Sequence, residues 1–114
     1  MREYLLLIMS SITDDEVRWR ILEILAEESR KKPSVWGVHR STIQESLGIP
    51  EKNMDYNMVY LAQNRLVKLV QVQSSVWLWA KLTLLGMDVL ENRSFYEERF
   101  PFVKAALLKE RKNK

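Results

Sequence analysis

The sequence of 114 residues contains no cysteine, and it has only three glycines and three prolines. Without cysteine the chain has no disulfide, no thiolate nucleophile and no cysteine-based zinc site, and this composition is compatible with a reducing compartment. The three glycines are isolated from one another, so the sequence also lacks a glycine-rich phosphate loop. These absences exclude several common classes of enzyme and cofactor site.

Histidine is equally scarce, because His39 is the only one. A metal cluster or a Ser-His-Asp arrangement would have to be built around this residue, which lies between two predicted elements. We expect it instead to contact a phosphate or to lie at the surface. The acidic run Asp14, Asp15 and Glu16 occupies the first turn of a predicted helix, where the helix dipole favours negative charge. We therefore expect no enzymatic activity, no bound metal or cofactor and no small-molecule ligand.

Long apolar runs are also missing. The longest, "YLLLIM" at residues 4–9, is far shorter than the roughly 20 residues that cross a bilayer. The first residues lack a basic leader and a cleavage site of small residues, so a signal peptide is not predicted. We expect no membrane association and a cytoplasmic location.

The net charge of +3 is concentrated at one end of the chain. Residues 103–114 hold five Lys or Arg and one Glu, whereas residues 1–102 hold thirteen basic and fourteen acidic side chains. Attraction to phosphates depends on the basic groups that reach them, so the overall charge says little about the body of the protein. A basic tail is more often a solvated end than a nucleic-acid-binding arm.

A first helix is predicted from Thr13, which forms a capping box with Glu16, to the residues before Pro33. Its apolar stripe consists of Val17, Ile21, Ile24 and Leu25. A short extended piece, "SVWGVHR", follows, and a second short helix is predicted to begin at a capping box of Ser41 and Gln44 and to end at Gly48.

A longer helix is predicted after Pro50, which is accepted at a helix start. Its apolar face is formed by Met54, Met58, Leu61 and Ala62. The opposite face carries Asn53, Tyr56, Asn57, Tyr60 and Asn64. So many asparagines and tyrosines on an outer face indicate more than a requirement for solubility.

A β-hairpin is predicted from "LVKLVQVQ" and "VWLWAKLT", joined by Ser74 and Ser75. Strict alternation turns Val76, Leu78 and Ala80 toward the core. Trp77 and Trp79 then point outward, and we expect the terminal segments or a second subunit to cover them. Thr83 can cap a further helix, and Pro101 opens a last one.

The stretch "ESLGIPEKNMDYNMVYLAQNRLVKLV" resembles the helix-turn-helix and first wing strand of the winged helix-turn-helix family. The matching positions are Leu47, Gly48, Ile49, Met54, Met58, Leu61, Leu66 and Val67. "AKLTLLGMDVLENRS" is similar to the strand-to-helix exit of bacterial and archaeal regulators of this family, and the chain has a weaker similarity to small YjcQ-like winged-helix proteins, which end in a similar basic helix. Where the family usually has glycine before the wing, this chain has Asn64 and Arg65, and asparagine is the non-glycine residue best tolerated there.

The resemblance implies an α+β, mostly helical fold: a three-helix core plus a two-stranded wing over residues 13–92, an apolar extension over residues 1–12, and a C-terminal helical extension with a basic tail over residues 93–114. It also implies a transcriptional regulator that binds double-stranded DNA. The residues expected at the DNA are Arg40, Ser41, Thr42, Lys52, Asn53, Tyr56, Asn57, Tyr60, Gln63, Lys68, Ser74 and Ser75. Other roles remain open: Ser41 is needed as a cap, Lys68 can be a solvated strand residue, and the tyrosines can pack along the helix or against another subunit.

Apolar segments at both ends of the chain suggest a second hypothesis. The residues expected at a dimer or partner surface are Tyr4, Leu5, Ile8, Trp77, Trp79, Phe95, Phe100 and Phe102. We expect a homodimer, which would suit a DNA-binding regulator because such domains often read paired half-sites. The same segments can instead complete the core of one monomer. The alternative function is a winged-helix protein-interaction module that does not bind DNA.

Overall fold

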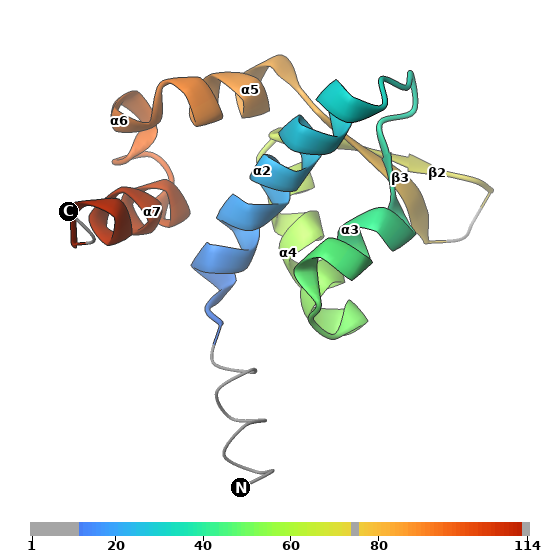
Figure 1. The fold of residues 1–114 in the computed structure, drawn as a ribbon, viewed down its shortest axis with the longest axis horizontal. Helices are drawn as coiled ribbons and strands as arrows, with labels where there is room; N and C mark the ends of the chain where they lie inside the picture. Colours follow the sequence, from blue (N-terminus) through green and yellow to red (C-terminus); the bar gives the residue numbers. More distant parts are fainter. Residues whose placement is uncertain (1–11, 74–75, 113–114) are drawn as a thin grey trace, which may run out of the picture.

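The computed structural model describes residues 12–73 and 76–112. The fold is α+β and mostly helical, and its elements are shown in Figure 1. In chain order they are α2 (Asp14–Lys31), β1 (Val38–His39), α3 (Arg40–Leu47), α4 (Glu51–Gln63), β2 (Val67–Gln71), β3 (Trp77–Leu82), α5 (Leu84–Glu91), α6 (Arg93–Tyr96) and α7 (Pro101–Lys112). The predicted helices and the hairpin are present, and α6 is an additional short helix.

Helix α2 is the central element, because α3, α4, α5 and α7 all pack against it. It begins as expected: the Thr13 side chain accepts a hydrogen bond from the backbone N–H of Glu16 at 3.1 Å. The expected apolar stripe is buried, together with Leu22. Each such side chain contributes roughly 1.5–3 kcal/mol when it leaves water, so this one helix supplies much of the core.

The three strands form an antiparallel sheet in the order β1-β3-β2. Strand β1 pairs Val38 with Ala80 of β3, and it is brought there by the turn at Gly37. Gly37 has a φ of 96°, and a Cβ at this position would lie 2.2 Å from the carbonyl oxygen of Ala80. Only glycine allows the chain to approach β3 so closely.

The hairpin differs from strict alternation at a register shift. Val70 of β2 pairs with Trp79, but the next residue, Gln71, pairs with Trp77, which leaves Leu78 as an extra residue. Such an insertion reverses the faces of the residues beyond it. Trp77 is therefore buried, with 4% of its surface exposed.

The structure thus corrects the predicted orientation of several side chains in the second strand of the hairpin. Val76, predicted to face the core, is 57% exposed, and Leu78 is only half buried, whereas Ala80 is buried as expected. Trp77, predicted to face outward, lies inside the monomer. Trp79 does lie on the outer face and is half buried, but the ring beside it belongs to His39, at 4.8 Å between centroids. No terminal segment among the described residues is needed to cover either ring.

The predicted capping box at the start of α3 is also wrong. His39 is the N-cap, and its Nδ1 accepts the backbone N–H of Ser41 at 3.1 Å, so Ser41 is not the cap. Gln44, the expected second member of that capping box, donates instead to the carbonyl oxygen of Ile49 at 2.6 Å. The predicted C-cap is present, with Gly48 in the left-handed conformation at a φ of 62°.

The turn from α4 into β2 uses a positive φ, as expected, but at Arg65 (63°) rather than at Asn64. Two later residues hold this turn. The hydroxyl of Thr83, which caps α5 as predicted, donates to the carbonyl oxygen of Arg65 at 2.7 Å. A Cβ on Gly86 would lie 2.2 Å from the carbonyl oxygen of Leu66, so only glycine fits there.

The C-terminal helices complete the core of the monomer. Phe102 is fully buried and lies 6.4 Å from Trp19 of α2, and Phe100 is also buried, so neither ring is available to a partner as predicted. Tyr96 is buried beside them, and its phenol donates to Asp88. This hydrogen bond to a carboxylate raises the pKa of Tyr96.

Candidate nucleic-acid interface

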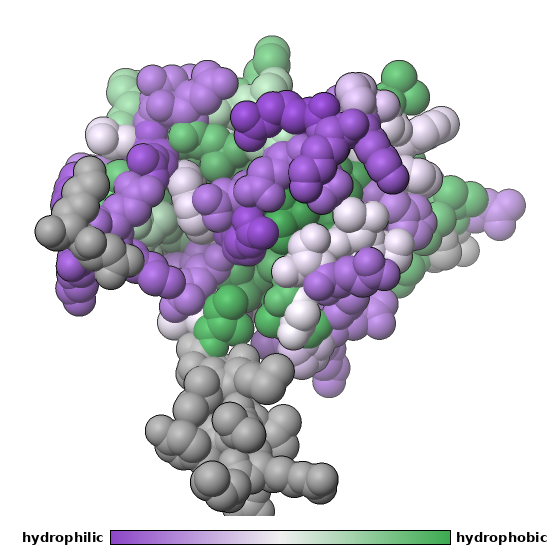
Figure 2. All heavy atoms as spheres, viewed as in Figure 1, coloured by the Kyte–Doolittle hydropathy of each residue, from purple (hydrophilic) through white to green (hydrophobic). Residues whose placement is uncertain are grey.

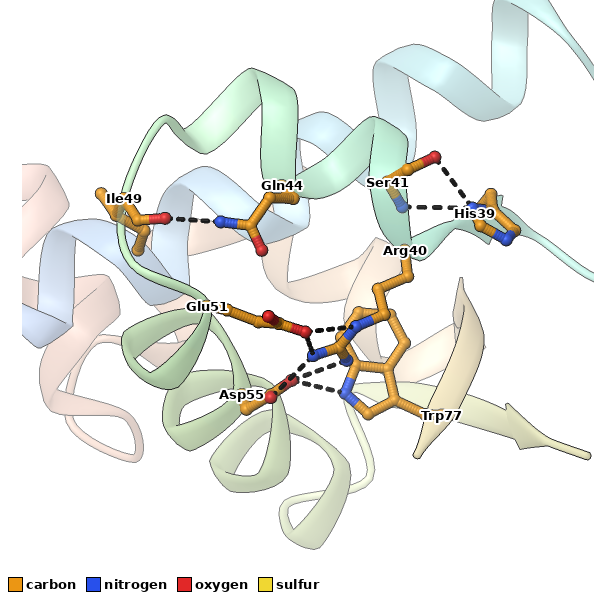
Figure 3. Close-up of polar contacts among 8 residues, drawn as sticks. All are labelled: His39, Arg40, Ser41, Gln44, Ile49, Glu51, Asp55 and Trp77. Carbon is orange, nitrogen blue, oxygen red and sulfur yellow. Dashed lines mark hydrogen bonds and ion pairs between the residues drawn. The ribbon is translucent and has the colours of Figure 1, made fainter. Parts of the chain in front are cut away.

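Helices α3 and α4 form a two-helix unit joined by the turn at residues 48–50. The turn is held by the left-handed Gly48 and by the hydrogen bond from Gln44 to Ile49, which Figure 3 shows. Met54, Met58 and Leu61 are fully buried, and they turn the opposite face of α4 toward solvent. The exposed side chains on that face are Lys52, Asn53, Tyr56, Val59 and Gln63. Four of the predicted DNA contacts are therefore at the surface of one helix.

A shallow hollow of about 520 Å³ lies along this face. It is lined by Arg18, Lys52, Asp55, Tyr56, Val59, Tyr60 and Gln63. Arg18 comes from α2, and its guanidinium lies 3.6 Å from the centre of the Tyr60 ring, which is a cation–π contact. Tyr60 also meets Phe102 of α7 edge to face, so it is half buried and packs against α2 and α7.

Asn57, predicted to contact DNA, is fully buried. Its side-chain oxygen accepts from Nε of Arg18 at 2.9 Å, and its Nδ2 donates to Asp14 at 3.1 Å and to the carbonyl oxygen of Asn53 at 2.8 Å. Asn57 therefore ties α4 to α2 and cannot reach a base. The prediction was wrong because these partners lie far away in the sequence.

Arg40, also predicted to contact DNA, is buried in an ion-pair cluster (Figure 3). Its Nη2 donates to Glu51 at 2.5 Å and to Asp55 at 2.7 Å, and its guanidinium lies 4.6 Å from the Trp77 ring. The indole N–H of Trp77 donates to Asp55 at 3.0 Å. We call Arg40, Glu51, Asp55 and Trp77 the arginine cluster. It joins α3, α4 and β3.

The arginine cluster removes one positive charge from the surface. Hydrogen bonding to Asp55 raises the pKa of Arg40 despite its burial, so its positive charge is retained inside the cluster. Its Nη1 lies 2.7 Å from Asp55 in an ion pair but without hydrogen-bond geometry. Since two carboxylates face one guanidinium, the cluster has one net negative charge, which offsets only one of the two positive charges of Lys52 and Arg18 on the α4 face.

The remaining predicted contacts are distributed over three places. Ser41 is exposed and Thr42 is half buried at the start of α3, and the Ser41 hydroxyl lies 2.9 Å from Nδ1 of His39. Lys68 is exposed on β2, away from α4. Ser74 and Ser75 lie outside the described residues, as do Tyr4, Leu5 and Ile8 of the predicted partner surface.

The outer face of the sheet carries a second polar surface, which sequence reasoning assigned only in part. Lys68 pairs across the strands with Lys81, and the next outward pair is Val70 with Trp79. His39 of β1 lies against Trp79. We call Lys68, Lys81, Trp79 and His39 the sheet face. A sequence signal could have found it: no Asp or Glu occurs between Asp55 and Asp88.

Exposed apolar surface occurs elsewhere. A groove of about 630 Å³ between α2 and α7 is lined in part by Ile12, Trp19, Ala105, Ala106 and Leu108. Phe95, a predicted partner residue, is 80% exposed on α6. In Figure 2 the hydrophilic residues cover most of the face over α2, and hydrophobic residues also reach the surface near the free end of the hairpin, where Val72 and Val76 are exposed.

Within residues 12–73 and 76–112, no group of three or more His, Asp or Glu is placed to hold a metal ion. None of the helices in the described part of the chain is both long and apolar enough to cross a membrane. Comparison with protein-family models, with curated proteins and with solved structures finds no significant match.

Proposed function

We propose that residues 13–92 form a winged helix-turn-helix unit and that the protein is a transcriptional regulator that binds double-stranded DNA. The observation that carries the proposal is the order of the elements together with the exposed face of α4. A helix, a short strand, two helices joined by a tight turn and a hairpin follow one another, and the sheet order is β1-β3-β2. The second helix of the pair presents polar side chains that nothing in the described chain covers.

In this proposal α4 enters the major groove, which is wide enough to admit a helix. The amides of Asn53 and Gln63 can pair with base edges, since such side chains form two hydrogen bonds with adenine. Lys52, Tyr56 and Arg18 lie on the same hollow and would contact the phosphate backbone. Ser41 and Thr42 at the start of α3 would contact a neighbouring phosphate.

The proposal includes a homodimer. The groove between α2 and α7 and the exposed Phe95 provide apolar surface that a second copy can cover. Two copies would place two α4 helices on paired half-sites. Sedimentation of the intact chain should give a mass of two chains, and a monomer at high micromolar concentration would contradict this part.

One observation favours the alternative, a protein-interaction module. The α4 face carries little net charge, because the net negative charge of the arginine cluster offsets one of the two positive charges of Lys52 and Arg18. It also exposes the aromatic ring of Tyr56 and the apolar Val59. A hollow with these properties suits an apolar side chain of a partner protein as well as it suits a base.

Duplex binding measured over a range of salt concentrations decides between the two functions. A labelled pool of random duplexes should bind the full chain at low salt, with an affinity that falls steeply as salt rises. The double variant Lys52→Ala, Tyr56→Ala should weaken binding about tenfold or more. The control is Lys104→Ala, Arg111→Ala, which removes two positive charges from exposed positions of α7 and leaves α4 unaltered. Absence of duplex binding at low salt would exclude the regulator.

A control that shortens the chain is unsuitable. Val103 and Leu107 of α7 are buried against the core, so a chain ending at Phe102 would lose part of its fold as well as its charge. Substitution of Lys109 and Lys112 removes two of the five basic charges of residues 103–114 and leaves these contacts in place. If this substitution alone removed duplex binding, the binding would be nonspecific attraction to the tail.

A further inference from the structure

The outer face of the sheet combines positive charge with an aromatic ring. Lys68 and Lys81 are direct cross-strand partners, and both are exposed. Like charges opposite one another in a sheet destabilise it. Within the described residues neither lysine has an ion-pair partner, although the chain contains fifteen acidic residues. The arrangement is unfavourable in the isolated protein and becomes favourable beside an anion.

The absence of acidic residues extends over the whole sheet. No Asp or Glu occurs from residue 29 to residue 44, which includes β1, or from residue 56 to residue 87, which includes β2 and β3. Every charge that the strands and their adjoining turns contribute is therefore positive. The helices that pack on the sheet lie against its inner side, where Val67 and Ala80 are buried. A polyanion fits this face by charge, and an apolar or basic partner does not.

The aromatic group lies next to the lysines. Trp79 lies two residues before Lys81 on the same face of β3, and its ring meets the His39 ring nearly at right angles, at 85°. Edge-to-face contact with His39 holds the indole in place. Trp36, in the turn that leads into β1, is 54% exposed. Its loop is fixed because Gly37 packs against Ala80 and Lys81, where a Cβ would have no room.

We propose that the sheet face binds single-stranded nucleic acid, with Trp79 stacking on a base and Lys68 and Lys81 contacting the backbone phosphates. Base stacking on aromatic rings beside a cationic groove is the general means of binding single strands, and it needs a base whose face is free. In a duplex the bases already stack on one another, so the ring favours a single strand. This site lies away from the exposed face of α4 and does not depend on duplex binding there.

The test uses the full chain and a labelled oligothymidine of about 12 nucleotides, followed by fluorescence anisotropy. The variant Lys68→Ser, Lys81→Ser should bind more weakly, and the slope of log affinity against log salt should fall by about 0.7 for each lysine lost. Lys104→Ser, Arg111→Ser removes the same charge from exposed positions of α7 and should bind as the unaltered chain does. Equal loss in both double variants would overturn the proposal, because the binding would then reflect net charge alone.

Substitution of the ring separates stacking from charge. Trp79→Leu should weaken oligothymidine binding about tenfold, and Trp79→Phe should restore most of it, since phenylalanine also offers a face for stacking. Circular dichroism and thermal melting of each variant show whether the fold is intact. If Trp79→Leu is folded and binds as well as the unaltered chain, or if polyglutamate displaces the oligothymidine at equal charge, the site is not a nucleic-acid site.

Failure of this proposal is distinguishable from failure of the proposed regulator. Lys52→Ala, Tyr56→Ala on α4 should lower duplex binding and leave oligothymidine binding unchanged. Lys68→Ser, Lys81→Ser should have a greater effect on oligothymidine than on duplex. The inference would be overturned if Lys52→Ala, Tyr56→Ala lost oligothymidine binding while Lys68→Ser, Lys81→Ser retained it. The single strand would then bind at α4.

Discussion

The positive side chains of the α4 region and of the sheet face have opposite surroundings. On the α4 side, Arg40 is buried between Glu51 and Asp55, so the cation stabilises the fold and is lost to the surface. On the sheet face, Lys68 and Lys81 are exposed side by side, and within the described residues no carboxylate pairs with them. The comparison shows that a basic residue in a helix-turn-helix pattern does not by itself supply a contact for DNA.

The two tryptophans of β3 show the same contrast. Trp77 lies in the arginine cluster, where its ring covers the guanidinium and its N–H bonds to Asp55. Trp79, two residues later, lies on the sheet face. Trp77 is therefore part of the core, whereas Trp79 lies at the surface, where we propose that it contacts a ligand. Four changes test these assignments, in order of decreasing expected effect.

Trp77→Ala should have the largest effect. The change removes a buried ring and exposes the arginine cluster, and replacing a buried aromatic by alanine costs about 3–5 kcal/mol. Urea denaturation followed by circular dichroism measures the loss of unfolding free energy. Trp79→Ala is the matched control and should cost less than half as much. Equal losses would contradict the division of the two rings between core and surface.

Arg40→Met should have the second largest effect on stability. The substitution retains the apolar stem but leaves Asp55 and Glu51 facing each other without a cation. Breaking a buried ion pair costs about 3–5 kcal/mol, and we expect roughly 3 kcal/mol, because the Glu51 side chain is 64% exposed. The control Arg20→Met breaks a surface pair with Glu27 and should cost less than about 1 kcal/mol. A stable Arg40→Met protein would mean that the cluster is not needed for folding.

Asn57→Ala should cost about 2 kcal/mol, because it removes a fully buried amide whose hydrogen bonds to the charged groups of Arg18 and Asp14 join α4 to α2. If Asn57 were instead a base contact, the variant would fold normally and lose duplex affinity. Thermal melting and duplex titration of the same variant separate the two outcomes. Asn53→Ala is the control: its side chain is exposed, so it should keep its stability and weaken duplex binding.

Lys81→Glu should have the smallest effect and the opposite sign. It converts a like-charge cross-strand pair into an opposite-charge pair, which should stabilise the fold by about 0.5 kcal/mol and weaken oligothymidine binding. Lys68→Glu should do the same. The double variant restores a like-charge pair, so the two gains should not add. Additive gains in chemical denaturation would show that the two lysines do not interact.

Features that depend on neighbours in the chain could be predicted from the sequence. Thr13 caps α2 through a residue three positions later, Gly48 ends α3 by its own φ, and Thr83 caps α5 through Gly86. The capping box at Ser41 was wrong although it is also local. His39 supplies an imidazole nitrogen to the same backbone N–H, a role that the sequence pattern does not reveal.

The α4 face could be predicted only in part. Helical periodicity separates the buried Met54, Met58 and Leu61 from the exposed Lys52 and Tyr56 correctly. It does not distinguish an exposed polar residue from one covered by another helix. Asn57 and Tyr60 lie at the edge of the face, where α2 covers them with Arg18.

The sequence by itself determined where α2, α4 and α5 begin and which apolar stripes of α2 and α4 face the core, because capping and periodicity act over three or four residues. Only the tertiary structure decided which polar and aromatic side chains are buried and which partners they contact. Asn57 forms hydrogen bonds with Arg18 and Asp14, which are 39 and 43 residues away in the sequence. Trp77 forms one with Asp55, which is 22 residues away. A buried polar group must have a partner, and which partner it meets depends on how distant elements pack. The register shift at Leu78, which turned Trp77 inward and left Trp79 outside, is likewise set between strands rather than within one.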